Sequence, residues 1–219
     1  MALVDCSLFD GIFDDDVQKL YTCLNAFEGD FKSGEEVCSY DRAKSVLGVV
    51  ISGKIIIKKI DSNGNTIILD TIEDNGVFSN VMNFTPTGFN FIGVYASMPT
   101  KVVFFDYNKV FVRCSSACEC HSVFVKNLFE VVIKKSKDLS QRIEIISNKT
   151  IREKLLSYFS ILAKKVASRN FTLPMSLTAI AEYICVDRSA MMRELKKLGE
   201  DGIIKLNKKN VTILFDEYI

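Results

Sequence analysis

Two short apolar-periodic segments joined by a tight turn lie near the C-terminal end of this chain, within residues 176–204. In the first segment, Leu177, Ile180 and Ile184 recur at steps of three and four and therefore share one helical face. The second segment, Asp187 to Gly202, carries an apolar stripe of the same period and ends at a glycine. Because only about two residues separate the segments, the two helices must cross at a steep angle, as in a helix-turn-helix.

The outward face of the second helix carries the side chains that could contact a nucleic acid. It shows, in order, Arg188, Ser189, Met192, Arg193, Lys196 and Lys197. Ser176, a good N-cap residue, and Thr178 open the first helix and complete the candidate contact set. From the periodicity alone, an ordinary helix pair fits as well as a DNA-binding one, because basic residues on a solvated helix face are common.

Charge is divided unevenly along the chain, although the formal net charge is only +1. Residues 1–110 hold 9 Lys and Arg against 15 Asp and Glu, a balance of −6. Residues 150–210 hold 12 against 6, a balance of +6. This polarity indicates one acidic domain and one domain that favours a polyanion.

The segment from Phe31 to Phe105 has the pattern of short strands and turns. The predicted strands are Leu47–Ile51, Ile55–Ile60, Thr66–Leu69, Val94–Ala96 and Val102–Phe105. Asn63-Gly64, between the second and third of these, is a strong hairpin signal. Short strands at regular spacing predict an antiparallel barrel or sandwich rather than a βαβ sheet. A short helix is predicted before them, over Asp14–Asn25, with acidic residues in its first turn.

A long helical pattern follows, beginning at a capping box that opens with Ser116. One apolar residue recurs every seven positions, with further apolar residues beside the row: Val125, Val132, Leu139 and Ile146, then Leu128, Phe129 and Ile143. That length and spacing are typical of a coiled-coil dimer helix. A helix packed on its own barrel is the alternative, because Lys135 and Arg142 interrupt the seam. Part of the stripe could serve both surfaces.

The C-terminal part is predicted to start after a hinge at Ser147–Lys149, with a second capping box at Thr150 and Glu153. A helix through about Lys165 follows, and two short strands at the end of the chain flank a basic turn with Lys208 and Lys209. Such a wing is well placed to contact phosphate. The predicted domains are therefore an effector-sensing β-barrel (1–115), a long dimerisation helix (116–147) and a winged helix-turn-helix DNA-binding domain (148–219).

In this order, these parts resemble the CRP/FNR family of bacterial transcription regulators over nearly the whole chain. The motifs that carry the resemblance are Leu8-Phe9-Asp10-Gly11-Ile12, the strand segment Gly48–Gly53 and the helix start Cys185–Leu195. The resemblance implies an α+β fold: an N-terminal antiparallel β-barrel of the cyclic-nucleotide-binding kind (a double-stranded β-helix or jelly-roll), a long dimerisation helix and a C-terminal winged helix-turn-helix. It also implies a homodimer on a palindromic operator, with half-sites roughly 34 Å apart, and contact with RNA polymerase.

Two arginines match family positions that contact bases or phosphates, Arg188 and Arg193. The guanidinium fork of arginine suits this task because it matches the N7 and O6 acceptors of guanine. Ser189 stands where many relatives carry a glutamate that accepts from cytosine. The resemblance therefore implies an operator of different sequence.

Relatives that bind a cyclic nucleotide carry a Gly-Glu-Leu segment and, about eleven residues later, Arg-Ser-Ala. The glutamate receives the ribose hydroxyl and the arginine neutralises the cyclic phosphate. The matching positions here are Ser79-Asn80-Val81 and Asn90-Phe91-Ile92. Burying a phosphate without a cation is costly, so cyclic AMP is not expected to bind, and no cofactor is predicted.

The same region could instead line a pocket for an apolar or aromatic effector. The candidate pocket residues are Phe78, Ser79, Asn80, Asn90, Phe91, Val125 and Leu128. The alternative is that the aromatic residues of this region, among them Phe84, Phe89 and Tyr95, are core residues of the barrel.

Seven cysteines in no regular framework fit a reducing compartment better than disulfides. The N-terminal stretch is acidic where a signal peptide is basic, and no apolar run has membrane-spanning length. The sequence therefore predicts a cytoplasmic protein that does not enter a membrane.

Cys118, Cys120 and His121 form a candidate cluster for metal binding, but no metal is predicted. Cys114 would share a helical face with Cys118 and His121, but the capping box places it before the helix. Redox sensing is the other reading, because Cys118 is predicted to lie in a first helical turn, where a thiolate is favoured. The scattered cysteines before residue 40 do not match the N-terminal clusters of the family's iron–sulfur members.

An enzyme is not expected. The one histidine has no identifiable base partner, and neither a glycine-rich phosphate loop nor a nucleophile elbow is evident. The sequence predicts a sequence-specific DNA-binding regulator under an unidentified signal. The alternative is a ligand-binding or protein-interaction module whose helix pair never meets DNA.

Overall fold

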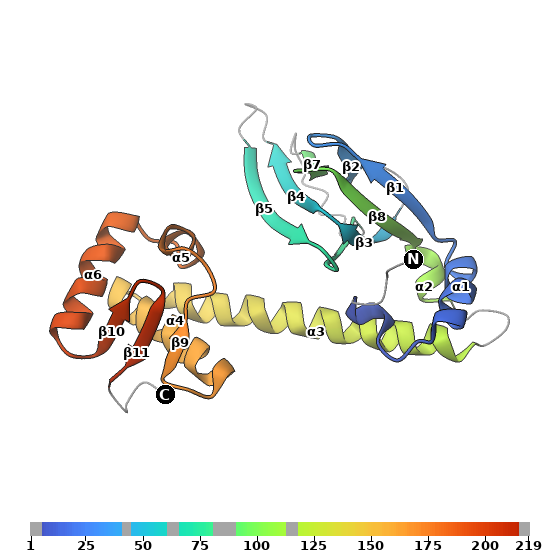
Figure 1. The fold of residues 1–219 in the computed structure, drawn as a ribbon. Coiled ribbons are helices and arrows are strands. Elements are labelled where there is room, and N and C mark those ends of the chain that lie inside the picture. The colour runs from blue at the N-terminus through green and yellow to red at the C-terminus, as the bar shows by residue number, and fades with distance from the viewer. Residues whose placement is uncertain (1–5, 41–44, 61–65, 81–90, 113–117, 215–219) are drawn as a thin grey trace. The chain divides into compact units, whose positions relative to one another are not determined.

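The computed structural model describes residues 6–40, 45–60, 66–80, 91–112 and 118–214. The chain divides into two compact units, Met1–Val132 and Ile133–Ile219, which join within one long helix (Figure 1). The predicted domain boundaries at residues 115 and 147 stay predictions. Each unit is described by itself below.

Two four-stranded antiparallel sheets form the body of the N-terminal unit (Figure 1). One sheet has the order β1-β8-β3-β6 and consists of Phe27–Phe31, Thr100–Asp106, Val46–Ser52 and Val77–Ser79. The other has the order β2-β7-β4-β5 and consists of Glu36–Ser39, Phe91–Ala96, Lys54–Ile60 and Thr66–Glu73. The predicted antiparallel barrel is confirmed, and each predicted strand lies within or overlaps an observed one. The predicted hairpin turn at Asn63-Gly64 lies outside the described residues.

Strands β3 and β8 are buried on both faces, because successive side chains of a strand point to opposite sides. Val50 and Val102 face the second sheet and join the core between the sheets. Val49 and Val103, their neighbours along the chain, face the other way into a second core. That second core is covered by four helical segments: η1 (Ser7–Phe9), α1 (Asp14–Cys23), α2 (Tyr107–Val110) and the start of α3 (Glu119–Ser147).

Gly48 lets the ring of Phe78 lie directly over strand β3. A Cβ at Gly48 would collide with atoms of that ring. Phe78 is thereby seated in the core between the sheets, edge-on to Phe104 with ring centroids 6.2 Å apart. The glycine of this predicted barrel-strand motif is therefore required by close packing.

Helix α3 begins at Glu119 in the described chain and runs to Ser147. The predicted capping box at Ser116 lies outside the described residues, and Cys118 stands directly before the helix rather than in its first turn. In the described parts of the chain, no helix is both long and apolar enough to span a bilayer.

The C-terminal unit packs three helices and a small sheet around one core. The helices are α4 (Ile151–Val166), α5 (Leu177–Tyr183) and α6 (Arg188–Glu200), and the antiparallel sheet has the order β10-β11-β9, made of Ile204–Asn207, Asn210–Ile213 and Asn170–Thr172. The capping box that starts α4 is confirmed: Thr150 and Glu153 exchange backbone-to-side-chain hydrogen bonds of 2.9 and 3.1 Å. The backbone N–H of Thr150 lowers the pKa of the Glu153 carboxyl. Strand β9 was not predicted.

Candidate DNA-binding interface

Helices α5 and α6 each begin at the predicted N-cap residue. The hydroxyl of Ser176 accepts a hydrogen bond from the N–H of Ala179 at 3.2 Å. The carboxylate of Asp187 accepts one from the N–H of Ala190 at 2.8 Å. Both caps satisfy donors that the first turn of a helix leaves without an intrahelical partner.

The turn between the two helices is tight and includes a left-handed residue. Cys185 has φ +53°, a conformation that glycine adopts most easily. The N–H of Val186 donates to the carbonyl of Ala181 at 2.9 Å and closes the turn. Buried side chains on both helices, Ile180 and Ile184 from α5 and Met191 from α6, fix the crossing from inside.

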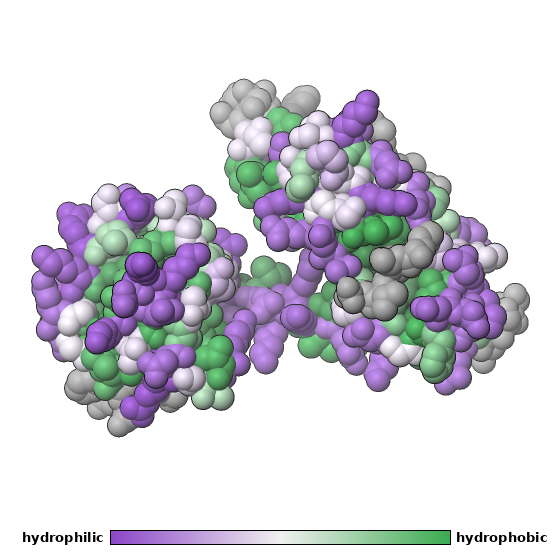
Figure 2. Space-filling view, viewed as in Figure 1, coloured by the Kyte–Doolittle hydropathy of each residue, from purple (hydrophilic) through white to green (hydrophobic). Residues whose placement is uncertain are grey.

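One face of α6 is buried and the opposite face is open to solvent. Met191, Leu195 and Leu198 enter the core, whereas the predicted contact residues are all exposed: Arg188, Ser189, Met192, Arg193, Lys196 and Lys197. Hydrophilic residues cover the outer edge of this unit at α6 (Figure 2). Within the described ranges, no carboxylate lies within ion-pair distance of Arg188 or Arg193. Both guanidinium groups are therefore available to a ligand.

The predicted wing is the turn between β10 and β11. Asn207 pairs with Asn210, which leaves Lys208 and Lys209 as a two-residue exposed turn. Lys208 has φ +55°, and the carbonyl of Lys209 accepts from the N–H of Leu173 at 2.8 Å. The third strand β9 thus holds the wing from one side, and two lysines project where a phosphate contact is expected.

Arg152, on α4, holds α6 through two carboxylates. Its guanidinium donates to Glu194 at 3.2 Å and to Asp201 at 2.7 Å. These acceptors lie in the middle and just past the end of α6, so one side chain fixes both the position and the rotation of the helix. This role of Arg152 was not predicted from the sequence. The two acceptors are 42 and 49 residues away in sequence, and no local pattern joins them.

The C-terminal end of α5 is held by cations from two other helices. Nε of Arg142, on α3, donates to the carbonyl of Tyr183 at 3.1 Å, and its guanidinium lies 5.1 Å from the centroid of the Tyr183 ring. Nζ of Lys154, on α4, lies 3.5 Å from the carbonyl of Ile184. Cations near the C-terminal end of a helix stabilise it, because this end is the negative pole of the helix dipole. Arg142 interrupts the apolar seam, as predicted, because it contacts the helix-turn-helix.

The exposed apolar residues of α3 lie along one side of the helix. Phe129, Leu139 and Ile143 are 65%, 60% and 59% exposed, and Val132, Ile133 and Ile146 are exposed too. By contrast, Leu128 is buried in the N-terminal unit and Val125 is half-buried there. The predicted stripe therefore serves two surfaces: its first turns pack on the barrel, and the rest is uncovered.

The described apolar members of the predicted effector pocket lie in two separate cores. Phe78 belongs to the core between the sheets, whereas Val125 and Leu128, both on α3, belong to the core between the helices and the other face of one sheet. Asn90 and the side chain of Phe91 lie outside what the structure describes, as do Phe84 and Phe89. The effector pocket stays a prediction.

Ser79 and Asn80 connect strands of the barrel. Asn80 is 4% exposed, its Oδ1 accepts from the N–H of Val46 at 2.7 Å, and its Nδ2 donates to the carbonyl of Ser39 at 3.1 Å. The hydroxyl of Ser79 donates to the carbonyl of Val46 at 3.0 Å. Asn80 stands where nucleotide-binding relatives are expected to carry the ribose-binding glutamate. Here that position ties β3 to β2.

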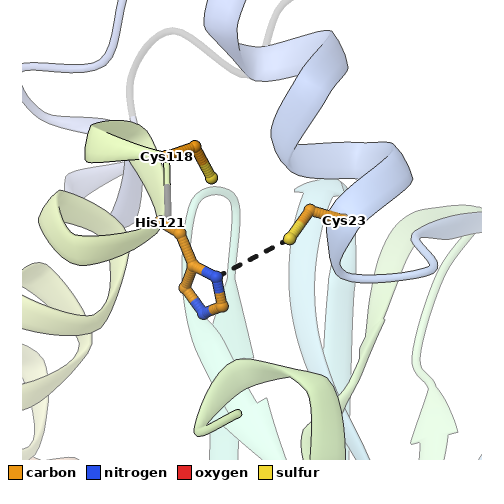
Figure 3. A group of neighbouring side chains, drawn as sticks. All are labelled: Cys23, Cys118 and His121. Carbon is orange, nitrogen blue, oxygen red and sulfur yellow. Dashed lines mark hydrogen bonds between the residues drawn. The ribbon is translucent and has the colours of Figure 1, made fainter. Parts of the chain in front are cut away.

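Two of the weak metal candidates come together with a cysteine that the sequence analysis set aside. Ligand atoms of Cys23, Cys118 and His121 lie within 4.8 Å of one another, at the end of α1 and the start of α3 (Figure 3). Cys120 is buried and does not belong to this group, and Cys114 lies outside the described residues. Cys23 was missed because it is 98 residues from His121.

Comparison with known proteins gives the C-terminal segment a family. Residues 153–215 match the Crp-like helix-turn-helix domain. The protein ycf28 of Porphyra purpurea, which carries the name of an HTH-type transcriptional regulator, is 26% identical over 174 residues, 77% of this chain and 71% of that protein.

Solved structures share the fold over most of the chain. CprK complexed with OCPA has a TM-score of 0.65 at 18% identity and covers 90% of this chain and 92% of its own. A CooA variant from Carboxydothermus hydrogenoformans has a TM-score of 0.56 at 15% identity, over 89% and 86%. The catabolite activator protein of Thermus thermophilus has a TM-score of 0.51 at 15% identity, over 94% and 93%. At these identities the likeness establishes the fold alone.

Proposed function

We propose that this chain, as a DNA-binding transcription regulator of the CRP/FNR family, acts as a homodimer on a palindromic operator. A signal received by its N-terminal unit controls its affinity for the operator. The Crp-like helix-turn-helix domain over residues 153–215 is the observation that carries the DNA-binding role. The exposed cationic face of α6 supports it, because a recognition helix presents its outer side chains to the major groove.

Within this proposal, Arg188 and Arg193 contact bases or phosphates, and Ser189 and Met192 lie against base edges. Arginine can donate two hydrogen bonds to guanine, whereas the short hydroxyl of Ser189 can bond to any base. Lys208 and Lys209 of the wing contact the phosphate backbone, as do Ser176 and Thr178 at the start of α5. Phosphate contacts fix register and base contacts supply sequence preference.

The dimer contact of this proposal is the exposed stripe of α3. An uncovered apolar row along several helical turns is unfavourable in water, and a second copy of the same helix can cover it in a two-fold arrangement. The seam runs along Val132, Leu139 and Ile146, with Phe129 and Ile143 beside it.

The dimer is tested by placing charges in the seam. Leu139→Glu combined with Ile143→Glu is expected to give a monomer in sedimentation equilibrium, with operator affinity reduced at least about a thousandfold. Lys137→Glu is the matched control, since it changes charge on the opposite face of the same helix and is expected to stay dimeric. A double variant that remains dimeric would refute this assignment.

DNA binding is tested by fluorescence anisotropy on the DNA upstream of the protein's own gene, with a salt titration. Specific binding whose logarithm falls with the logarithm of salt concentration, by about 0.9 per phosphate neutralised, supports the regulator. The second candidate function is a ligand-binding or protein-interaction module. It is favoured if no salt-sensitive DNA binding occurs under any condition.

The proposed signal is a small molecule or an ion. Asn80 supports the exclusion of cyclic AMP, since its amide is occupied within the barrel. CprK is described in complex with OCPA, which is consistent with a small-molecule signal in this fold. Contact with RNA polymerase, a cytoplasmic location and the lack of an enzymatic activity are further parts of the proposal.

A further inference from the structure

The corner where α1 ends and α3 begins collects two thiols and an imidazole from segments far apart in the sequence. Cys23 is the last residue of α1, Cys118 directly precedes α3, and His121 lies in the first turn of α3. The three side chains converge in Figure 3. Sulfur and imidazole nitrogen are the ligand types that zinc prefers in proteins.

The separations suit a small tetrahedral ion. With a Zn–S bond of about 2.3 Å and a Zn–N bond of about 2.0 Å, sulfur and nitrogen ligands lie roughly 3.5 Å apart and two sulfurs roughly 3.8 Å apart. The Sγ of Cys23 lies 3.6 Å from Nδ1 of His121. All three ligand atoms lie within 4.8 Å of one another. No pair therefore has to close by more than about 1.3 Å around a bound ion.

The imidazole is held in the tautomer that a metal requires. Nε2 of His121 lies 2.8 Å from the carbonyl of Val110, in α2. A carbonyl only accepts, so Nε2 carries the proton, and Nδ1 of the neutral ring presents its lone pair to the two thiols. Metal-binding histidines typically donate their second ring N–H to such an acceptor, which fixes the ring orientation. His121 is 6% exposed, so this orientation is also fixed by packing.

The other cysteines that the structure describes in the N-terminal unit do not lie beside a second thiol and an imidazole in this way. Cys6 is buried and Cys38 is half-buried, and loss of solvent raises the pKa of both thiols, that of Cys38 to about 12. They are protonated near neutral pH and do not belong to the group. Cys120 is buried beside the site, and its sulfur does not lie with the three ligand atoms.

We propose that Cys23, Cys118 and His121 bind one zinc ion, through two thiolates and Nδ1, at the junction of α1, α2 and α3. Binding releases the two thiol protons to solvent and forms two Zn–S bonds and one Zn–N bond. The described residues supply three ligands, so a water molecule or another small ligand takes the fourth position. The bound ion links the first turn of α3 to the end of α1. This site goes beyond the DNA-binding function, and its test involves no DNA.

The experiment uses the full chain, reduced and stripped of metal with a chelator, titrated with Co²⁺ and then with Zn²⁺. One equivalent of cobalt is expected to produce a thiolate-to-metal charge-transfer band, and zinc is expected to displace it. Cys23→Ser and Cys118→Ser should each lower zinc affinity at least about a hundredfold. Cys185→Ser is the matched control: it removes an exposed thiol of the other unit and should bind as the unchanged protein does. Circular dichroism establishes that each variant is folded.

A second measurement needs no variant, because His121 is the only histidine in the chain. Its imidazole nitrogens give unambiguous NMR signals, and zinc is expected to move the Nδ1 signal while Nε2 stays protonated. The proposal is overturned if the chemical shifts of the histidine nitrogens do not change on addition of zinc, or if both serine variants bind zinc as tightly as the control. A Cys23–Cys118 disulfide found by mass spectrometry in reduced, zinc-treated protein also overturns it.

Discussion

Helix α6 and the strand that ends at Ser79 use their polar side chains in opposite ways. On α6, Arg188 and Arg193 are exposed, and in the described chain no carboxylate pairs with them. After β6, the amide of Asn80 is buried and bonded on both sides to neighbouring strands. The first arrangement leaves groups available for a partner, and the second uses the group to hold the fold. A polar residue at a family's binding position is therefore informative only once its hydrogen bonds are known.

The largest effect is expected from removing the buried amide. Asn80→Ala should lower the free energy of unfolding of the N-terminal unit by about 2–4 kcal/mol, since it leaves the N–H of Val46 and the carbonyl of Ser39 buried without their partner. Urea denaturation followed by circular dichroism measures this. Asn108→Ala, an exposed asparagine of the same unit, is the control and should change little. If both variants are equally stable, the amide of Asn80 does not stabilise the fold.

Removal of the exposed arginines should leave stability unchanged and reduce discrimination between DNA sequences. Arg188→Ala and Arg193→Ala are each expected to leave stability within about 0.5 kcal/mol of the unchanged protein. Each should cost about 1–3 kcal/mol of discrimination between operator and unrelated DNA, because a base contact is lost. Competition binding measures the ratio, and Lys164→Ala removes an exposed cation of α4 as a control. Unchanged discrimination in both arginine variants would contradict the proposal that Arg188 and Arg193 contact the bases of the operator.

An intermediate case is Arg152, which is partly exposed and bonded to α6. Arg152→Met should lower stability by at most about 1 kcal/mol, since its ion pairs face solvent. Operator affinity should fall while the preferred base sequence stays the same, because the helix loses its anchor and keeps its reading side chains. Selection from a randomised operator library compares the base preference of the variant with that of the unchanged protein. A changed preference would show that Arg152 itself contacts DNA.

The smallest effect is expected from cyclic AMP. Millimolar cyclic AMP should leave the melting temperature unchanged, since the phosphate would be buried without a cation and Asn80 is already bonded within the barrel. Differential scanning fluorimetry measures this. A clear upward shift would show that the barrel binds the nucleotide by other residues, and the contrast with α6 would then disappear.

Local patterns in the sequence predicted much of the C-terminal unit. Ser176, Asp187 and Thr150 were identified as N-caps from their own neighbours, and each accepts the expected hydrogen bond. The exposed face of α6 followed from the helical period, because burial of one side decides which residues remain outside. The wing followed from two short strands around a basic turn. These features depend on residues only a few positions apart.

The pairing of distant segments could not be predicted in this way. Arg142 is a polar residue within the apolar pattern of α3, but its contact with Tyr183 spans 41 residues. Strand β9 has only three residues, too few for a period, and it exists because Thr172 and its neighbours pair with β11. The division of the α3 stripe between a barrel contact and an open surface was likewise left undecided.

By itself, the sequence determined the element types, their order, the N-caps and the identity of the outward side chains, since helix and strand periods and cap chemistry are local. Only the tertiary structure decided which polar groups are already satisfied and which are available. It turned Asn80 inward, bonded Arg142 to α5 and Arg152 to α6, and brought Cys23 to His121. The physical reason is that satisfaction of a polar group depends on its neighbours in space, and chain folding chooses those neighbours across tens of residues.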